Sequence, residues 1–200
     1  MTPRHEPGGA PGEPMPPGVM AAAEGASRPP RETATFDPHR PDWRFLLRSP
    51  WHVIALGFGS GLPRFAPGTC GTAFAWASFA VLDRWLDGAG WAAVLVIGFV
   101  LGAVAAHRTG LRLGIIDSGH IVIDEIVAFW AVLSLLPARA PTWVAALAFV
   151  LFRMFDIGKP APIKRLDARI KNGLGVMLDD VVAAFYTLLV IAIIWRLAHG

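Results

Sequence analysis

The sequence predicts an all-α fold: a polytopic membrane helix bundle preceded by a disordered N-terminal tail. Hydrophobic residues make up 54% of the 200 residues and charged residues 16%, whereas soluble globular domains have about 45–50% and about 25%. The mean hydropathy is +0.49. The apolar residues gather in long uncharged runs after residue 42, which leaves little polar surface. We therefore favour insertion into a bilayer over the alternative, a soluble helical protein with an unusually large core.

Residues 1–42 are expected to form the disordered tail. Ten of the 17 prolines fall in this segment, among scattered Gly, Ala, Glu and Arg residues. Such a stretch has no apolar periodicity and cannot bury enough surface to offset the entropy lost on ordering. We interpret it as a spacer, with a short binding motif as the alternative. Residues 43–200 are then the membrane-embedded domain.

Five uncharged runs predict the helices of that domain. In chain order they span residues 73–82, 88–106, 126–137, 141–152 and 181–195. Only the second run reaches the roughly 20 residues of a spanning helix. The shorter runs have to tilt, pair or re-enter the bilayer. We expect about four or five apolar helices.

The charges between the runs predict their orientation. Every lysine of the chain lies in residues 153–180, together with several arginines, whereas residues 83–90 and 137–141 are weakly basic. Basic connections tend to stay in the cytoplasm. If each run crosses once, residues 107–125 and 153–180 both lie on the cytoplasmic side.

Most carboxylates outside the tail fall on this predicted cytoplasmic side. They are Asp117, Asp124, Glu125, Asp156, Asp167, Asp179 and Asp180. A single acid at a helix N-terminus is commonly a cap, but carboxylates beside hydrocarbon are costly unless they pair or bind cations. Several carboxylate oxygens suit Mg²⁺, with substrate phosphate oxygens completing its shell. No His/Cys cluster offers a zinc site, and the single Cys70 excludes an internal disulfide.

Basic and glycine-rich residues near the acids suggest a phosphorylated ligand. Arg153 and Lys159 lie three residues before and after Asp156, on one face of a helix, where they could hold a phosphoryl group. Residues 57–72 form a glycine-rich stretch whose backbone amides could approach a phosphate. The alternative is a flexible turn at the membrane interface. The candidate residues of this stretch are Gly59, Ser60, Gly61 and Thr69. No basic run is interleaved with aromatic residues, so nucleic acid is not expected as a partner.

Three motifs occur in a fixed order along the chain. The first comprises Gly59–Leu62 and Pro67–Thr69, the second Asp117 and Ile121–Glu125, and the third Phe152–Ile163, Asp167 and Gly173–Asp180. Together they resemble the phosphatidylglycerophosphatase A family of bacterial membrane phosphatases, over roughly residues 48–195. The chain departs from the family pattern at Pro63-Arg64, Ala128, Gly158 and Asn172, and none of these departures removes a carboxylate, Arg153 or Lys159.

The resemblance implies hydrolysis of phosphatidylglycerol phosphate, a lipid with a terminal phosphomonoester, to phosphatidylglycerol and phosphate in phospholipid biosynthesis. It implies a Mg²⁺ requirement and an active site on the cytoplasmic face of a bacterial inner membrane. Under this hypothesis Asp117 or His120 orients or deprotonates the attacking water, while Arg153 and Lys159 hold the phosphoryl group. His120 has a structural hydrogen bond as its alternative role. The metal ligands are then Asp124, Glu125, Asp156, Asp179 and Asp180.

A small membrane transporter, with the acids relaying ions, is the non-enzymatic alternative. A transporter would place its acids near the middle of helices, whereas the acids of this chain are expected at helix ends. A cysteine-dependent phosphatase built on Cys70 would need an arginine where Trp76 stands.

Overall fold

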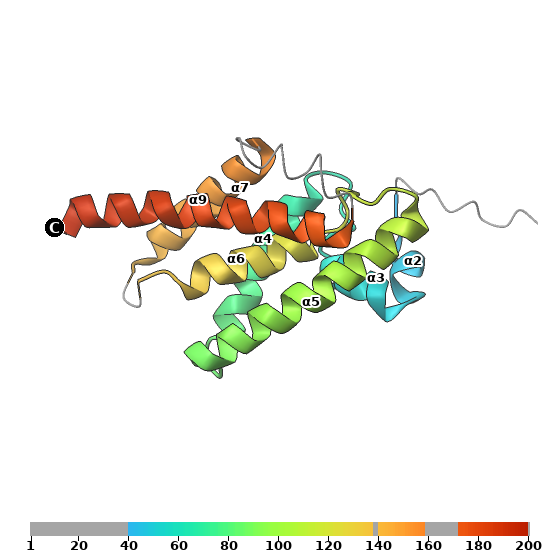
Figure 1. Ribbon diagram of the computed structural model, residues 1–200, viewed down its shortest axis with the longest axis horizontal. Helices are drawn as coiled ribbons and strands as arrows, with labels where there is room; N and C mark the ends of the chain where they lie inside the picture. Colours follow the sequence, from blue (N-terminus) through green and yellow to red (C-terminus); the bar gives the residue numbers. More distant parts are fainter. Residues whose placement is uncertain (1–39, 138–139, 159–171, 200) are drawn as a thin grey trace, which may run out of the picture. The chain divides into compact units, whose positions relative to one another are not determined.

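The computed structural model describes residues 40–137, 140–158 and 172–199. In these residues the chain forms seven α-helices, one 3-10 turn and no strand (Figure 1). The elements are α2 (Trp43–Leu47), α3 (Pro50–Ala55), η1 (Gly57–Gly59), α4 (Pro67–Leu82), α5 (Gly88–Leu113), α6 (Ile123–Ser134), α7 (Thr142–Gly158) and α9 (Gly173–His199). The all-α prediction is confirmed for this part of the chain. Most of the predicted tail, residues 1–39, lies outside the described residues.

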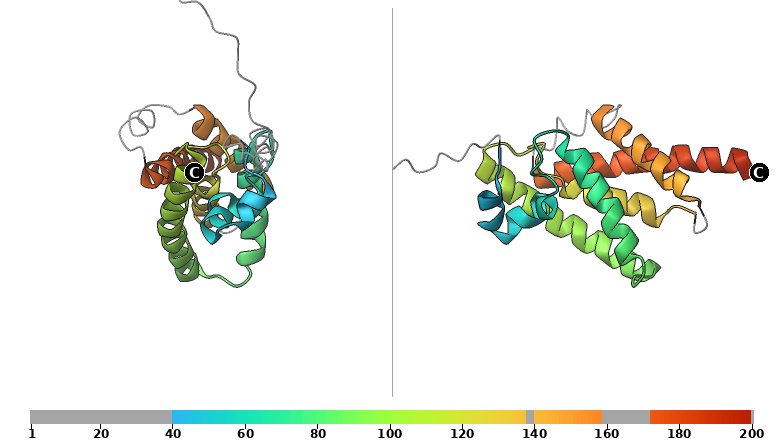
Figure 2. Two further views of the ribbon diagram at one scale, coloured as in Figure 1. Left: turned by 90° about the vertical axis from the view of Figure 1, so that its right-hand side faces the viewer. Right: turned by 180° about the vertical axis from the view of Figure 1, so that it is seen from behind.

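Helix α6 is the centre of the helical domain. It packs against α4, α5, α7 and α9; Figure 1 shows it between α9 and α5, and the view from behind in Figure 2 brings α4 and α7 to the front. Ile126, Phe129 and Val132 on α6 are fully buried, as is Phe152 on α7. Beyond its first turn α6 is apolar apart from Ser134, as is typical of a buried helix. The first turn of α6, which contains Asp124 and Glu125, is buried as well.

The helix ends that hold the acidic residues meet at one end of the domain. The start of α4 contacts the start of α6 and the end of α7, because a Cβ atom at Gly68 would meet both Glu125 and Arg153. The start of α9 lies against the last third of α5, where a Cβ atom at Gly173 would overlap the Ala103 carbonyl oxygen. Glycine permits this close approach of two helices. Two glycines thus let helices that are far apart in the sequence lie against one another at this end of the domain.

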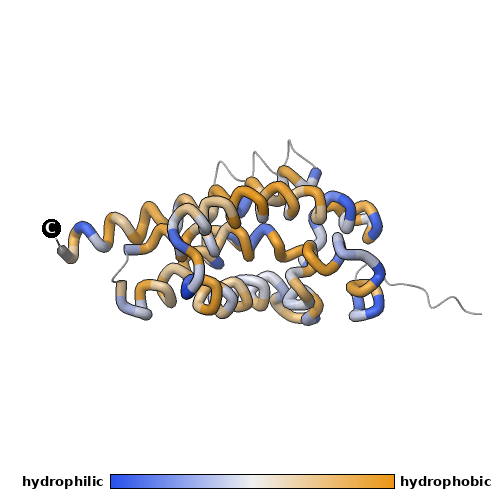
Figure 3. The backbone as a smooth tube through the Cα atoms, turned by 90° about the horizontal axis from the view of Figure 1, so that it is seen from below, coloured by the Kyte–Doolittle hydropathy of each residue, from blue (hydrophilic) through white to orange (hydrophobic). Residues whose placement is uncertain are grey.

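Among the helices that the structure describes, two, α5 and α9, are long and apolar enough to cross a membrane, by length and composition (Figure 3). Only 22% of the most apolar stretch of each helix is buried within the protein. Apolar surface of this extent is typical of contact with lipid. How many of the shorter apolar helices cross stays a prediction.

Helix α9 is longer than the uncharged run that predicts it. It begins at Gly173 rather than near residue 181, because the Asn172 side-chain oxygen accepts hydrogen bonds from the backbone N–H groups of Leu174 (3.0 Å) and Gly175 (3.1 Å). Asparagine is a favoured N-cap. Asp179 and Asp180, expected just before a helix, therefore lie inside one. The departure from the family pattern at Asn172 is thus explained as a helix cap.

Candidate active site: a cavity lined by carboxylates

Two hydrogen bonds position the loop that leads into α6. The Val122 N–H donates to the Ala55 carbonyl at 2.9 Å, and His120 Nδ1 donates to the Gly61 carbonyl at 2.6 Å. These bonds tie the loop to α3 and to the segment after η1. As a result Asp124 and Glu125, the acids of the first turn of α6, are buried, with exposed fractions of 8% and 9%.

Six carboxylates from four segments line one cavity of about 230 Å³. They come from the loop before α6, the start of α6, the end of α7 and the second turn of α9. The acidic residues are Asp117, Asp124, Glu125, Asp156, Asp179 and Asp180, and the remaining lining residues are Ser118, Gly119, Ile121 and Val176. All five predicted metal ligands are brought together here, beside Asp117. Asp167 and Lys159 lie outside the described residues.

The cavity places like charges in a buried environment. Burial raises the pKa of Glu125 from its ordinary 4.5 to about 8, even though the Arg153 guanidinium acts in the opposite direction. Burial also raises the pKa of Asp124, and the neighbouring Glu125 charge adds to this. Desolvation and mutual repulsion both favour the neutral acids. The site therefore favours a ligand of high positive charge.

Arg153 pairs with two of the acids. Its Nη1 donates to Asp156 Oδ2 at 2.6 Å and to Glu125 Oε1 at 3.1 Å. The Arg153–Asp156 pair has the i,i+3 spacing on which the sequence-based prediction rested. Because the guanidinium contacts carboxylates, its contribution in this structure is to hold Glu125 and Asp156. Its predicted role on a phosphoryl group stays a prediction, as does that of Lys159.

The donor set fits a divalent cation. Three buried carboxylate oxygens, Asp124 Oδ1, Glu125 Oε2 and Asp180 Oδ2, have no hydrogen-bond partner among the described residues. Buried polar atoms are normally satisfied, and carboxylate oxygens are what Mg²⁺ prefers. Within the described residues no three acids or histidines already converge on a single metal position.

Comparison with known proteins decides the family. The sequence profile of phosphatidylglycerophosphatase A matches residues 53–195, more than half of the chain. The chain belongs to the phosphatidylglycerophosphatase A family. The resemblance inferred from the three motifs is confirmed, and with it the prediction of a phosphatase.

Individual relatives agree with this assignment. The phosphatidylglycerophosphatase A of Escherichia coli (strain K12) is 40% identical over 140 residues, which cover 70% of this chain and 80% of the relative. That of Haemophilus influenzae is 39% identical over 148 residues, covering 74% and 90%. A relative from Bacteroides thetaiotaomicron, provisionally named as a phosphatidylinositol-3-phosphatase, is 36% identical over 146 residues, covering 70% and 91%. No solved structure matches the chain significantly.

In this member of the phosphatidylglycerophosphatase A family, the glycine-rich stretch packs against the loop before α6 rather than lining the cavity. Ser60 Oγ donates to the Gly57 carbonyl at 2.7 Å, and Gly61 lies so close to the His120 carbonyl that a Cβ atom would overlap it. The described lining of the cavity includes none of the four residues predicted to bind phosphate: Gly59, Ser60, Gly61 and Thr69. His120 is likewise held by a backbone carbonyl. The phosphate-binding role of these glycines and the acid–base role of His120 stay predictions.

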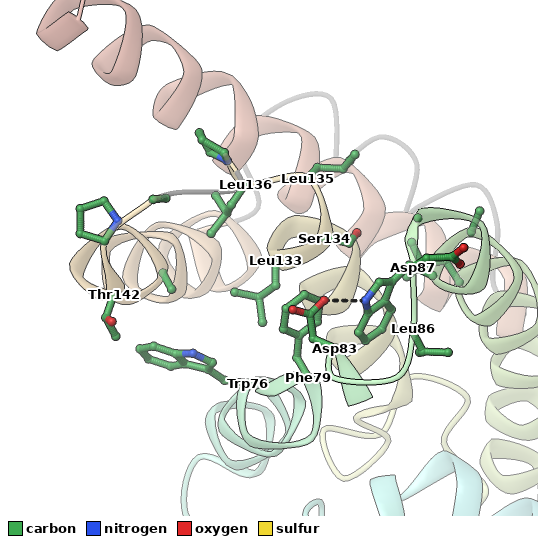
Figure 4. Close-up of a pocket in the computed structure, with 18 residues that line it drawn as sticks. Trp76, Phe79, Asp83, Leu86, Asp87, Leu133, Ser134, Leu135, Leu136 and Thr142 are labelled. Atoms are coloured by element: carbon green, nitrogen blue, oxygen red, sulfur yellow. Dashed lines mark hydrogen bonds between the residues drawn. The ribbon is translucent and has the colours of Figure 1, made fainter. Parts of the chain in front are cut away.

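A second and larger cavity lies at the opposite end of the helices. It has a volume of about 570 Å³ and is walled largely by apolar residues such as Trp76, Phe79 and Leu133 (Figure 4). Asp83 accepts a hydrogen bond from the Trp91 indole N–H at 2.9 Å, and Asp87 caps α5 through the Gly90 N–H. Both acids there have structural partners, so the carboxylate-lined cavity is the candidate active site.

Proposed function

We propose that this chain hydrolyses the terminal phosphomonoester of phosphatidylglycerol phosphate, with Mg²⁺, at the cytoplasmic face of a bacterial inner membrane. The observation that carries the proposal is the cavity in which six carboxylates meet. Three of their buried oxygens have no hydrogen-bond partner in the part of the chain that the structure describes. The names of the relatives supply the substrate. In this reaction water attacks phosphorus, the bond from phosphorus to the glycerol oxygen breaks, and that oxygen gains a proton.

The position of the cavity suits a lipid headgroup. It lies beyond the end of α5 and beside the first turns of α9, which are the two helices able to cross a membrane. An end of a membrane-crossing helix lies near the interface, where the phosphate of a phospholipid resides. The phosphomonoester can therefore reach the acids while the acyl chains stay in the bilayer.

We assign the residues of the cavity as follows. Five acids hold Mg²⁺: Asp124, Glu125, Asp156, Asp179 and Asp180. When bound, the metal neutralises phosphate oxygens and lowers the pKa of coordinated water. Asp117 is exposed at the rim of the cavity, where its carboxylate can accept a hydrogen bond from the attacking water. Arg153 keeps Glu125 and Asp156 in place, and Lys159 is proposed to contact the substrate phosphate.

The test is phosphate release by the purified protein in detergent micelles that contain phosphatidylglycerol phosphate. We expect turnover with Mg²⁺ and its loss in EDTA. Phosphatidic acid and glycerol 3-phosphate serve as comparison substrates, because each lacks one part of the proposed lipid. Phosphatidylinositol 3-phosphate is included because one relative carries that name. Preferred hydrolysis of any comparison substrate would replace the proposed substrate.

The same protein distinguishes an enzyme from an ion transporter. Reconstituted vesicles loaded with a pH-sensitive dye report proton movement without any phosphate ester. Proton or cation flux in the absence of phosphate release would favour the transporter. Phosphate release without flux supports the phosphatase.

A further inference from the structure

Gly68, the second residue of α4, lies directly against the ion pair between Glu125 and Arg153. It is buried, and a Cβ atom added to it would overlap Glu125 Oε1 and lie 2.9 Å from Arg153 Nη2. Glu125 Oε1 is also the oxygen that accepts from Arg153 Nη1. Any side chain at position 68 therefore has to displace this pair.

Thr72 reinforces the same contact one turn further along α4. Its side chain is fully buried, and its Oγ1 donates to the Gly68 carbonyl at 2.9 Å. The hydroxyl oxygen then faces Arg153 Nη1 and accepts from it at 3.5 Å. Arg153 is in this way held between α4 and its two carboxylate partners.

The consequence concerns which oxygen of Glu125 is available to a cation. Oε1 is taken up by Arg153, whereas Oε2 is buried without a hydrogen-bond partner among the described residues. We infer that Gly68 and Thr72 are positioning residues, which fix Arg153 and Glu125 so that Glu125 presents Oε2 to a divalent cation. This inference rests on the proposed function, since it assumes that Glu125 is a metal ligand.

The test measures Mg²⁺ affinity directly, by titration calorimetry on the full-length protein in detergent. For Gly68→Ala we expect the dissociation constant to rise roughly 10–100-fold, the range typical of changes to residues that orient metal ligands. The atoms that the new Cβ displaces are the ends of flexible side chains. We therefore expect this variant to fold, with a melting temperature in EDTA close to that of the wild type.

Two conservative substitutions at Thr72 provide the second part of this test. Thr72→Ser keeps the hydroxyl, and we expect near wild-type Mg²⁺ affinity. Thr72→Val keeps the shape and removes the hydroxyl, so the Mg²⁺ affinity falls several-fold and the Mg²⁺ concentration for half-maximal turnover rises in step. The KM for the lipid stays unchanged in all three variants, because none of these positions lines the cavity.

Thr187→Val on α9 is the matched control for Thr72→Val. The Thr187 hydroxyl is likewise fully buried and donates to the carbonyl four residues earlier, that of Ala183, at 2.8 Å, but Thr187 does not line the carboxylate cavity. We therefore expect its Mg²⁺ affinity to stay at the wild-type value. A loss of stability common to both valine variants is thus separated from a loss of Mg²⁺ affinity, which is expected only for Thr72→Val.

Gly68→Ala with wild-type Mg²⁺ affinity, or equal affinities for Thr72→Val and Thr72→Ser, overturns the inference. Absence of Mg²⁺ binding by the wild type overturns it as well. If the wild type binds Mg²⁺, the variants weaken that binding, and phosphatidylglycerol phosphate is not hydrolysed, the proposed substrate fails and the positioning role stands. If the protein hydrolyses phosphatidylglycerol phosphate but Gly68→Ala has an unchanged Mg²⁺ requirement, the proposed function stands and the positioning role fails.

Discussion

The buried acid Glu125 is expected to make the metal-free protein less stable as the pH rises. Its side chain is 11% exposed, and burial raises its pKa from 4.5 to about 8. The folded protein thus holds this proton more tightly than the unfolded chain does. The contribution of Glu125 to stability is therefore fully present below pH 4.5 and is lost as the pH rises past 8. At about 1.4 kcal/mol per pKa unit, the change amounts to roughly 5 kcal/mol.

Thermal unfolding of the detergent-purified protein in EDTA, between pH 5 and pH 9, measures this effect. The matched variant is Glu125→Gln, which keeps the shape of the neutral acid. Since about 1 kcal/mol changes the melting temperature of a chain of this size by roughly 2–4 °C, the wild type should lose on the order of 10 °C more than the variant across this range.

Mg²⁺ should restore the melting temperature of the wild type at pH 8, because metal binding favours the deprotonated ligands of the folded state. The variant, which lacks one carboxylate, should respond less. Equal pH dependence in wild type and Glu125→Gln would refute the argument from burial. A wild-type melting temperature that rises relative to the variant between pH 5 and pH 8 would refute its sign.

Three further predictions concern the cavity and the fold. Asp124→Asn and Asp180→Asn should each lower kcat by at least the roughly 10–100-fold that loss of a residue supporting a metal ligand costs. The melting temperature in EDTA should not fall, because asparagine keeps the shape of the neutral acid that burial favours. Full turnover in a phosphate-release assay would remove that residue from the site. Asn172→Ala should cost about 1 kcal/mol of stability through loss of the α9 cap, seen as a melting temperature lower by roughly 2–4 °C; an unchanged value would mean that the cap contributes nothing. Trp130→Phe removes the indole N–H that donates to the Ala75 carbonyl at 3.0 Å, which should cost about 1 kcal/mol with unchanged turnover; altered kcat would contradict a purely structural role.

Much of the fold follows from local sequence, because a helix depends on residues a few positions apart. The uncharged runs predict where α4, α5, α6, α7 and α9 lie, although not their exact ends. The run over 181–195 gives no sign that α9 starts at Gly173, because the charged pair Asp179-Asp180 separates the run from the apolar residues of the first turns. Asp179 and Asp180 were accordingly expected outside the helix that carries them.

The composition of the candidate site also follows from the sequence, through connectivity. If each uncharged run crosses once, successive helices run in opposite directions. The acids before α6, at the end of α7 and in the first turns of α9 then fall at one end of the domain, where they line one cavity. The three motifs then identify the family, which the comparisons confirm. The sequence alone thus determined the family of the protein and which acids are candidate metal ligands.

Only the tertiary structure decided how those residues meet. His120 bonds to Gly61, 59 residues away, and Arg153 contacts Thr72 across 81 residues. Nothing in a local pattern specifies such pairs, since they depend on how closely helix ends approach one another. Gly68 illustrates the reason: its missing side chain acquires a role only because α4 brings it against Glu125 and Arg153.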